Sequence, residues 1–488
     1  MSPEALAHYL DDRSLAGEPA EGAAAGRAGG AACGDRIEVS LRLGNGMVRD
    51  VRQRASGCAA ARAAAAATAA LVDDAALTDV ARIGAREISD ELGGLSPVGA
   101  HASELASEAL HRALGTSVAA SEGALLDAPP AGRERVLVAI SGGVDSAVAA
   151  LRERERGAEV IAVTLELWTD PINDGERSCC SADAVRTARR VAHSLGVPHL
   201  TVDLRDSFRA GVVEPFLAGY AEGLTPNPCV RCNGRVRIEP MIELARRLGA
   251  AALATGHYAR LADDGDGPLL AAASDPAKDQ AYMLAGLDPA ALASMRFPLG
   301  GLSKPEVRDL AREAGLEVAD RRESQDLCFL AGEGKARFLE RHGGLGSRPG
   351  EITDRSGRVL GAHDGHHRFT VGQRRGLRVA APEPLYVLST DASSNRVVAG
   401  PADQLETDRV DVRDVTLHRP AGRVGSVKLR YRSAPLRCRL TSGSGSPPAA
   451  GAHEALRVEL AAPVRAAAPG QTAVFLDGDR VVGHATIA

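Results

Sequence analysis

Between residues 135 and 330, apolar runs typical of strands alternate with stretches in which apolar residues recur at helical spacing. Strands are predicted at 136–140, 159–167, 199–203 and 251–255, and helices at 147–155, 182–195 and 240–248. This alternation predicts a parallel sheet covered by helices on both faces. Ligands of such sheets bind beyond the carboxyl ends of the strands, so we expect the functional groups of this region at that edge.

Beyond about residue 338 the pattern changes to short β-type runs separated by Gly, Pro, Asp and Asn. The runs are 386–389, 396–400, 427–431, 456–460 and 472–476. They predict one or two small β-barrel or sandwich modules, with a hairpin loop at 441–451. Two Ala/Gly-rich stretches predict irregular structure, with 18–32 as a flexible loop and 117–132 as an interdomain linker.

A chain of 488 residues is long enough for about three domains. Aromatic residues make up only 3% of it, so base stacking is not expected to be its main contact with nucleic acids. Residues 1–132 have 11 basic and 18 acidic side chains, whereas residues 335–440 have 20 basic and 11 acidic ones. A polyanion is therefore expected at the second region, with a merely solvated basic face as the alternative.

No run of 18 or more apolar residues occurs, and the N-terminus lacks the basic start of a signal peptide. We therefore expect a cytoplasmic protein with no membrane partner. Its eight cysteines are then expected to be thiols, metal ligands or catalysts and not structural disulfides.

Residues 141–146, Ser-Gly-Gly-Val-Asp-Ser, follow the predicted strand 136–140 and precede an Ala-rich helical pattern. The glycines permit a tight turn whose N–H groups face an anion, and the helix start adds unpaired donors and partial positive charge. The segment predicts a phosphate cradle, but not a Walker loop, because no Gly-Lys-Ser/Thr closes it. It resembles the pyrophosphatase loop of enzymes that adenylate substrates with ATP, a superfamily too broad to define the reaction.

Cys229 and Cys232 lie in residues 225–233, Thr-Pro-Asn-Pro-Cys-Val-Arg-Cys-Asn. The two prolines predict a stiff loop and not a helix, and a rigid loop that presents thiols suits catalysis or metal binding. Cys328 is a third thiol of this region. A lone CxxC favours a zinc or redox site, but no second CxxC follows in this region, so a closed tetrahedral zinc site is not expected.

Further motifs occur in the order of one family. They are found at 225–233, 255–258, 278–282, 323–329, 370–377, 430–432 and 469–471. With the loop at 141–146 they resemble the tRNA-specific 2-thiouridylases of the MnmA type over about residues 134–488. The resemblance implies ATP-dependent replacement of the C2 oxygen of the wobble uridine of tRNA by sulfur, with Mg²⁺, and with a cysteine desulfurase or another sulfur carrier as partner.

The same resemblance implies three domains after the linker at 117–133. They are an adenine-nucleotide alpha-hydrolase-like (PP-loop) domain at 134–335, a central β-rich domain at 336–405 and a C-terminal tRNA-binding β-barrel at 406–488.

By this resemblance, Cys232 is the nucleophile and Cys328 carries the persulfide sulfur, and the two close a disulfide once sulfur is released. The implied ATP-binding residues are Ala139, Ile140, Ser141, Gly142, Gly143, Val144, Asp145, Ser146, Leu165 and Gly256. The implied tRNA-binding residues are Asn227, His257, Lys278, Asp279, Gln280, Arg430, Tyr431 and Gln471. Nearby positive charge favours thiolates, and the candidates for it are Arg231, Arg321 and Arg322.

Cys229 departs from the family pattern, because many members have Asp at this position. A variant mechanism therefore stays open, in which Cys229, Cys232 and Cys328 hold three irons of a [4Fe–4S] cluster and the fourth iron binds sulfide. Cys179 and Cys180 are candidates for a further thiol. Persulfide chemistry is the primary hypothesis.

Residues 1–116 share none of these motifs. Their motifs at 8–9, 32–35, 56–59 and 93–101, with the alternating strand 37–43, resemble the IscU/NifU-like iron–sulfur scaffold family. The resemblance implies an α+β domain whose ligands for zinc or an iron–sulfur cluster are Cys33, Asp35, Cys58 and His101. Ala102 replaces the last cysteine of the family, so one ligand and acceptor thiol is missing. We hypothesise that this domain docks a cysteine desulfurase or relays sulfur, with a metal-free docking module as the alternative.

Two other classes of protein compete with a thiolating enzyme. One is another adenylating ligase, such as an argininosuccinate or lysidine synthetase, which would need neither paired thiols nor a basic β-rich region. The other is a non-catalytic iron–sulfur carrier, which would need no ATP loop. The combination of loop and thiols therefore favours the thiolating enzyme.

Overall fold

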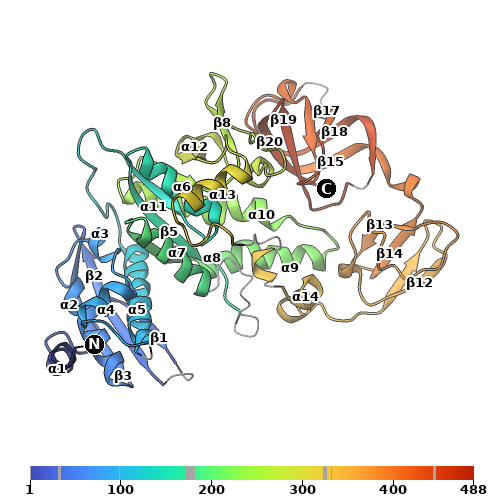
Figure 1. Ribbon diagram of the computed structural model, residues 1–488. Helices are drawn as coiled ribbons and strands as arrows, with labels where there is room; N and C mark the ends of the chain where they lie inside the picture. The colour runs from blue at the N-terminus through green and yellow to red at the C-terminus, as the bar shows by residue number, and fades with distance from the viewer. Residues whose placement is uncertain are drawn as a thin grey trace.

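The computed structural model describes residues 2–30, 34–97, 99–170, 182–321, 327–330, 332–442, 447–465 and 467–488. In Figure 1 an N-terminal α+β domain (blue) lies at one end, a parallel-sheet domain in the middle, and two β-rich parts (orange and red) at the other end. Among the helices in these ranges, none combines the length and the apolar character needed to cross a bilayer.

The N-terminal domain is a three-stranded antiparallel sheet with helices packed against it, as expected for an α+β fold. Its strands are β1 (Ala24–Gly29), β2 (Arg36–Gly44) and β3 (Met47–Ser56). Its helices are α1 (Pro3–Asp11), α2 (Ala59–Val72), α3 (Leu77–Val80), α4 (Ala85–Glu91) and α5 (Ala100–Ala120). Most of the alanines of α2 are buried, so small side chains build much of this core.

The flexible loop expected at 18–32 is wrong for β1, which pairs along its whole length with β2. The physical reason is close packing, because a Cβ at Gly26 would overlap the backbone of Ala109 and Ala113 in α5. Small residues thus let β1 lie directly against a helix. The composition that suggested flexibility serves here to bring two backbones together.

The middle domain contains a five-stranded parallel sheet in the order β10-β7-β4-β5-β6, which confirms the predicted α/β fold. The strands are β4 (Arg135–Ala139), β5 (Glu159–Glu166), β6 (His199–Asp203), β7 (Ala252–Thr255) and β10 (Met295–Arg296). The helices are α6 (Val144–Glu155), α7 (Ala182–Ser194), α8 (Arg205–Phe208), α9 (Glu214–Ala221), α10 (Pro228–Arg231), α11 (Glu239–Arg247), α12 (Pro289–Ala293), α13 (Lys304–Glu313) and α14 (Lys335–Gly343).

The stiff loop expected at 225–233 is wrong from Pro228 onward. The chain is helical there, running through α10, a π-helical segment (Cys232–Ile238) and α11. Pro228 occupies the first helical position, where no backbone donor is needed and its fixed φ suits a helix. Asn227 Oδ1 caps this start by accepting the N–H groups of Cys229, at 3.1 Å, and of the next residue. The proline therefore begins the helix that carries Cys229 and Cys232.

The remaining strands form two sheets, which confirms the expectation of β-rich parts. A four-stranded sheet has the order β12 (Val359–His363), β11 (Gly350–Thr353), β14 (Arg396–Gly400), β13 (Tyr386–Asp391). An eight-stranded sheet has the order β15 (Glu406–Leu417), β18 (Gly451–Arg465), β17 (Leu436–Thr441), β16 (Ser426–Lys428), β19 (Thr472–Asp477), β20 (Arg480–Ile487), β9 (Pro268–Ala271), β8 (Arg260–Asp263). Pairing of β15 with β20 closes it as a barrel.

Two details of this barrel differ from the expected strands. The predicted strand 427–431 ends at Lys428, so Arg430 and Tyr431 lie in the turn that follows. Strands β8 and β9 come from the sequence of the middle domain but join the edge of the barrel sheet. The sequence of the middle domain therefore contributes two strands to the barrel sheet, which is separate from the parallel sheet.

The N-terminal domain packs directly on the middle domain, because α5 lies against the edge strand β6. Gly115 permits this contact, since a Cβ there would overlap the carbonyl oxygen of Thr201. The backbone N–H of His199 also donates to the carbonyl of Ala81 at 2.8 Å. Helix α5 itself runs to Ala120, four residues into the expected linker. The two domains are thus joined by packing as well as by the chain.

Candidate functional site

Residues 141–146 connect the carboxyl end of β4 to the start of α6, where the sequence placed the phosphate cradle. Gly142 has φ +73° and lies against α7, since a Cβ there would be 2.8 Å from the carbonyl oxygen of Ala184. The Ser141 N–H donates to Ser146 Oγ at 3.1 Å, which closes the loop. Gly256, at the end of β7, packs on it so closely that a Cβ would lie 2.7 Å from the Ser146 nitrogen. Leu165 is buried on the neighbouring strand β5.

A lysine that sequence reasoning missed supplies positive charge at this loop. Asp145 Oδ1 accepts hydrogen bonds from Lys304 Nζ at 2.6 Å and from the Tyr258 hydroxyl at 2.9 Å. Lys304 is buried and begins α13, 159 residues along the chain from Asp145. Its only sequence signal is the position after Ser303 at a helix start. The loop therefore lacks a Walker lysine but obtains a cation from elsewhere in the fold.

Cys232 is buried and Cys229 is half-buried, one helical turn apart on the helix that Asn227 caps. Asn233, next to Cys232, donates through Nδ2 to the carbonyl of Met283 at 3.2 Å. Met283 belongs to a 3₁₀ turn (Ala281–Leu284) that directly follows Gln280. This hydrogen bond connects the cysteine helix to the segment formed by Gln280 and the 3₁₀ turn that follows it.

That segment is joined to the loop through Tyr258. Gln280 Oε1 accepts the backbone N–H of Tyr258 at 2.9 Å, and the Tyr258 hydroxyl donates to Asp145. A continuous series of contacts therefore runs from the phosphate loop to the helix of Cys232.

Cys328 begins a short 3₁₀ turn (Cys328–Leu330) and is half-buried. The next residue, Phe329, is buried with its ring centroid 5.1 Å from that of Phe216 and 5.0 Å from that of Phe338. Cys328 packs against the same hydrophobic cluster to which Cys232 belongs. Arg321, which precedes Cys328 in the chain, donates from Nη1 to the carbonyl of Gly142 at 3.1 Å.

Of the expected cationic neighbours of the thiols, Arg231 donates from Nε to the carbonyl of Gly211, and Arg321 contacts the loop as described. Arg322 lies outside the described residues, as do Cys33, Cys179 and Cys180.

The expected tRNA-binding residues fall into two groups near the cysteine helix. Asp279 and Gln280 lie beside Tyr258, and the Asp279 carboxylate accepts the backbone N–H groups of Ala273 and Ala281. His257 hydrogen-bonds through Nδ1 to Thr255 at 2.9 Å, and burial lowers its pKa to about 3, aided by the charge of Arg237. Lys278 precedes this group in the chain.

The second group surrounds residues 225–227. Gln471 donates from Nε2 to the carbonyl of Thr225 at 2.7 Å, and Asn227 lies next to Tyr282 through a side-chain hydrogen bond. The Tyr431 ring, which follows Arg430, lies 6.0 Å from that of Tyr282. Burial raises the pKa of Tyr431, and the charge of Asp279 adds to this rise. Residues from the barrel and from the parallel-sheet domain thus meet beside Cys229.

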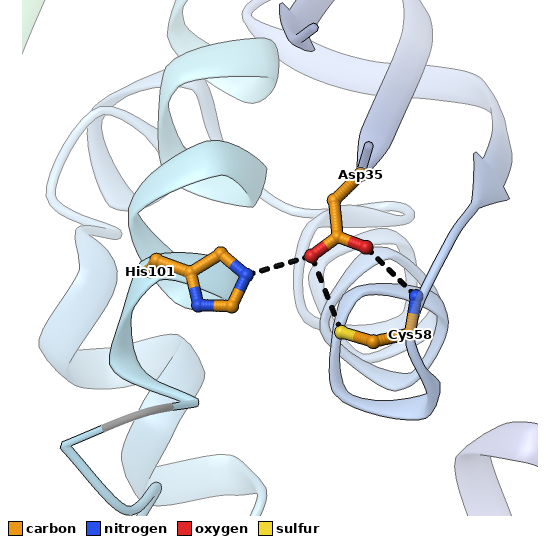
Figure 2. Close-up of side chains that lie close together, drawn as sticks. All are labelled: Asp35, Cys58 and His101. Carbon is orange, nitrogen blue, oxygen red and sulfur yellow. Dashed lines mark hydrogen bonds and ion pairs between the residues drawn. The ribbon is translucent and has the colours of Figure 1, made fainter. Parts of the chain in front are cut away.

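A separate donor site lies in the N-terminal domain (Figure 2). Asp35 Oδ2 is 2.6 Å from His101 Nε2 and accepts from Cys58 Sγ at 3.2 Å, while Oδ1 accepts the Cys58 N–H at 2.7 Å. The Cys58 backbone N–H and His101 lower the pKa of the Asp35 carboxyl, the former more strongly. Three donor atoms of these residues lie within 4.8 Å of one another. A thiol, an imidazole and a carboxylate of this spacing fit zinc or iron.

A second cluster of donors, Asp170, Glu333 and His342, has a different character. Arg341 ion-pairs with both Asp170 and Glu333, so a cation already sits between the carboxylates. We interpret it as an ion-pair network that joins the chain after β5 to α14.

Comparison with known families agrees with this layout. The family described as "tRNA methyl transferase HUP domain" matches residues 134–332, and "tRNA methyl transferase PRC-barrel domain" matches 336–401. "Aminomethyltransferase beta-barrel domain" matches 423–487, and "NifU-like N terminal domain" matches 2–120.

Among curated relatives, the "Bifunctional protein NifU/MnmA" of Rubrobacter xylanophilus is 44% identical, covering 100% of this chain and 98% of the relative. The "tRNA-specific 2-thiouridylase MnmA" of Geobacter metallireducens is 43% identical over 72% of this chain and 96% of its own length. That of Thermus thermophilus is 42% identical over 72% of this chain and 95% of its own length. The chain therefore belongs to the bifunctional NifU/MnmA family, in which a NifU-like domain precedes an MnmA-type 2-thiouridylase.

Proposed function

We propose that this protein replaces the C2 oxygen of the wobble uridine of tRNA by sulfur, converting ATP to AMP and pyrophosphate. The observation that carries the proposal is the contact series from Asp145 through Tyr258 and Gln280 to the helix of Cys232. It joins a phosphate-binding loop to thiols. A ligase of the argininosuccinate or lysidine type would have no use for such thiols, and an iron–sulfur carrier would have none for the loop.

In the first step the loop at 141–146 binds the phosphates of ATP through its N–H groups and the start of α6. Mg²⁺ would offset phosphate charge, and Asp145, whose Oδ1 already accepts from Lys304 and Tyr258, would offer it the other carboxylate oxygen. The C2 oxygen attacks the α-phosphorus, pyrophosphate leaves, and N3 of the uridine loses its proton. Lys304, held at Asp145, supplies positive charge beside the phosphates.

In the second step the terminal sulfur of a Cys328 persulfide attacks C2, and AMP leaves with the C2–O electron pair. The Cys232 thiolate then attacks the Cys328 sulfur. The S–S bond breaks toward the sulfur on C2, which yields 2-thiouridine and a Cys232–Cys328 disulfide. An external thiol must reduce this disulfide before the next cycle. Burial of Cys232 keeps competing oxidants away from it.

The N-terminal domain is proposed to receive sulfur or dock a cysteine desulfurase. Its site at Asp35, Cys58 and His101 would hold zinc or iron, and the exposed Cys58 is accessible to another protein.

The test is pyrophosphate release from purified protein with ATP, with and without unmodified tRNA, followed by mass spectrometry of the tRNA nucleosides. We expect release only with tRNA, and 2-thiouridine only when a sulfur donor is added. Release without tRNA, or no thiolated nucleoside, would contradict the proposal.

A cluster-based route through Cys229, Cys232 and Cys328 is the second candidate, favoured by the position of Cys229 one turn before Cys232. Iron and sulfide analysis of anaerobically purified protein separates the two routes. Activity without iron above background would exclude the cluster.

A further inference from the structure

Three motifs from different parts of the sequence meet at one residue, Thr225. It precedes the helix of Cys229 and Cys232, and it contacts the turn 469–471 of the barrel and Thr370 of the central β-rich part. The function proposed above assigns no role to this junction.

The barrel uses both backbone polar groups of Thr225. The Thr225 N–H donates to the carbonyl of Pro469 at 2.8 Å, and the Thr225 carbonyl accepts Gln471 Nε2 at 2.7 Å. Gly470, between them, has φ +87°, and a Cβ there would lie 2.9 Å from the Thr225 nitrogen. This turn is therefore in close contact with the segment before the cysteine helix and leaves no space for a larger residue.

Other contacts restrict the same segment from two more sides. The Thr225 hydroxyl donates to Thr370 Oγ1 at 3.4 Å, a long hydrogen bond. Pro226 packs against Gly219 in α9, where a Cβ would lie 2.9 Å from the proline ring. Backbone held on several sides in this way has few alternative conformations.

Two residues after Thr225, Asn227 caps the helix that carries Cys229 and Cys232. The hydroxyl of Tyr282, which also hydrogen-bonds Asn227, donates to the carbonyl of Thr472 in the barrel at 2.8 Å. The barrel thus holds the cap as well as the residue that leads into it.

We propose that Gln471 is a positioning residue that, with the turn 469–471, sets the start of the cysteine helix, so that the barrel domain controls where Cys232 lies. The resemblance assigned Gln471 to tRNA contact, but in the structure its side-chain amide donates to the carbonyl oxygen of Thr225. The sulfur-transfer consequence rests on the proposed function, whereas the positioning itself does not.

The test measures alkylation of the full chain by iodoacetamide without tRNA or ATP, in the reduced wild type and in Gln471→Ala. Trypsin cleaves after Arg231, so Cys229 and Cys232 are quantified on separate peptides. Because one hydrogen bond is lost, we expect the alkylation rate of Cys232 to rise about two- to tenfold. Tyr282→Phe, which removes the hydroxyl that hydrogen-bonds both Asn227 and the Thr472 carbonyl, should also raise it.

Cys438, in β17 of the barrel, is the internal control and should react at an unchanged rate. A rate at Cys232 equal to the wild type overturns the positioning role, as does an equal rise at Cys438, which would mean that the barrel had unfolded. Gln471→Glu cannot donate to the Thr225 carbonyl and should behave as Gln471→Ala does. Because alkylation needs no thiolation of tRNA, this measurement tests the positioning role even if the proposed function is wrong.

Discussion

Two cysteine sites among the described residues are built in opposite ways. At the N-terminal site Cys58 is exposed, and its partners Asp35 and His101 come from the same domain. At the second site Cys232 is buried, and contacts from the parallel-sheet domain and the barrel position its helix. An exposed thiol on one compact domain suits exchange with another protein. A buried thiol held by several domains suits a reaction that should take place only when the correct substrate is bound.

The difference also lies in how many contacts each site depends on. One carboxylate, that of Asp35, accepts the hydrogen bonds that join the N-terminal donors. The second site depends on contacts between residues more than 100 positions apart, such as Gln471 with Thr225 and Lys304 with Asp145. Single substitutions should therefore affect the two sites very differently.

The largest effect is expected from Cys232→Ser or Cys328→Ser. Each removes a sulfur atom on which the proposed transfer depends, so the rate of 2-thiouridine formation should fall about 10³-fold or more. The measurement is nucleoside mass spectrometry of tRNA from a deletion strain carrying each variant. Cys438→Ser is the matched control, since burial raises the pKa of that thiol to about 12 and makes it unreactive. Cys58→Ser should lower the rate of 2-thiouridine formation only partly. A complete loss with this variant would mean that thiolation depends on the N-terminal site as strongly as on Cys232 and Cys328.

Lys304→Met should reduce tRNA-dependent pyrophosphate release about 10²- to 10³-fold, because it removes a preorganised cation from the phosphate loop. Tyr258→Phe removes a neutral donor from the same carboxylate and should cost less, about two- to tenfold. Steady-state pyrophosphate assays measure both. Equal effects of the two substitutions would show that the charge of Lys304 is not what matters.

Asp35→Asn should weaken zinc binding by the N-terminal site about 10- to 100-fold, because it replaces the carboxylate that faces Cys58 and His101. Titration against a chromophoric chelator measures this affinity. Asp50→Asn is the matched control, since Asp50 is an exposed carboxylate of the same domain paired with Arg42. No difference between the two variants would remove Asp35 from the donor set.

The smallest effect concerns the contact between the two regions. His111, in α5, donates from Nε2 to the carbonyl of Ile83, and its ring lies 6.1 Å from that of His199 at the edge of the sheet. Burial lowers the pKa of both well below 6.5, and the charge of Arg189 adds to this. The unfolded chain binds protons there more readily, so stability is present above pH 6.5 and is lost as the pH falls below it.

Each of these histidines should lower the free energy of unfolding by up to about 1.4 kcal/mol for each pH unit below 6.5. Urea denaturation of the full chain at pH 7.5 and 5.5 measures the loss, and His111→Gln should make it smaller. His453, which is half-buried on the barrel strand β18, is the control position for the same substitution by Gln. A wild-type stability that is independent of pH in this range would contradict the burial of the neutral rings.

Two expectations from the sequence were wrong because the same residues suit two different structures. The Ala/Gly composition of 18–32 is common to flexible loops and to strands packed closely on a helix, and only the contact of Gly26 with α5 distinguishes them. Proline at 228 prevents a helix that would run through it but favours one that begins there, and this choice depended on the cap at Asn227.

The sequence by itself determined the features that depend on patterns of neighbouring residues. The period of apolar residues predicted the parallel sheet, the glycines at 142 and 143 predicted a tight turn between strand and helix, and the ordered motifs indicated the family. The tertiary structure alone decided that Lys304 lies at Asp145, that Gln471 holds Thr225, and that α5 covers β6. These contacts join residues far apart in the chain, and no spacing along a sequence records which distant side chains a packed core will bring within hydrogen-bond distance.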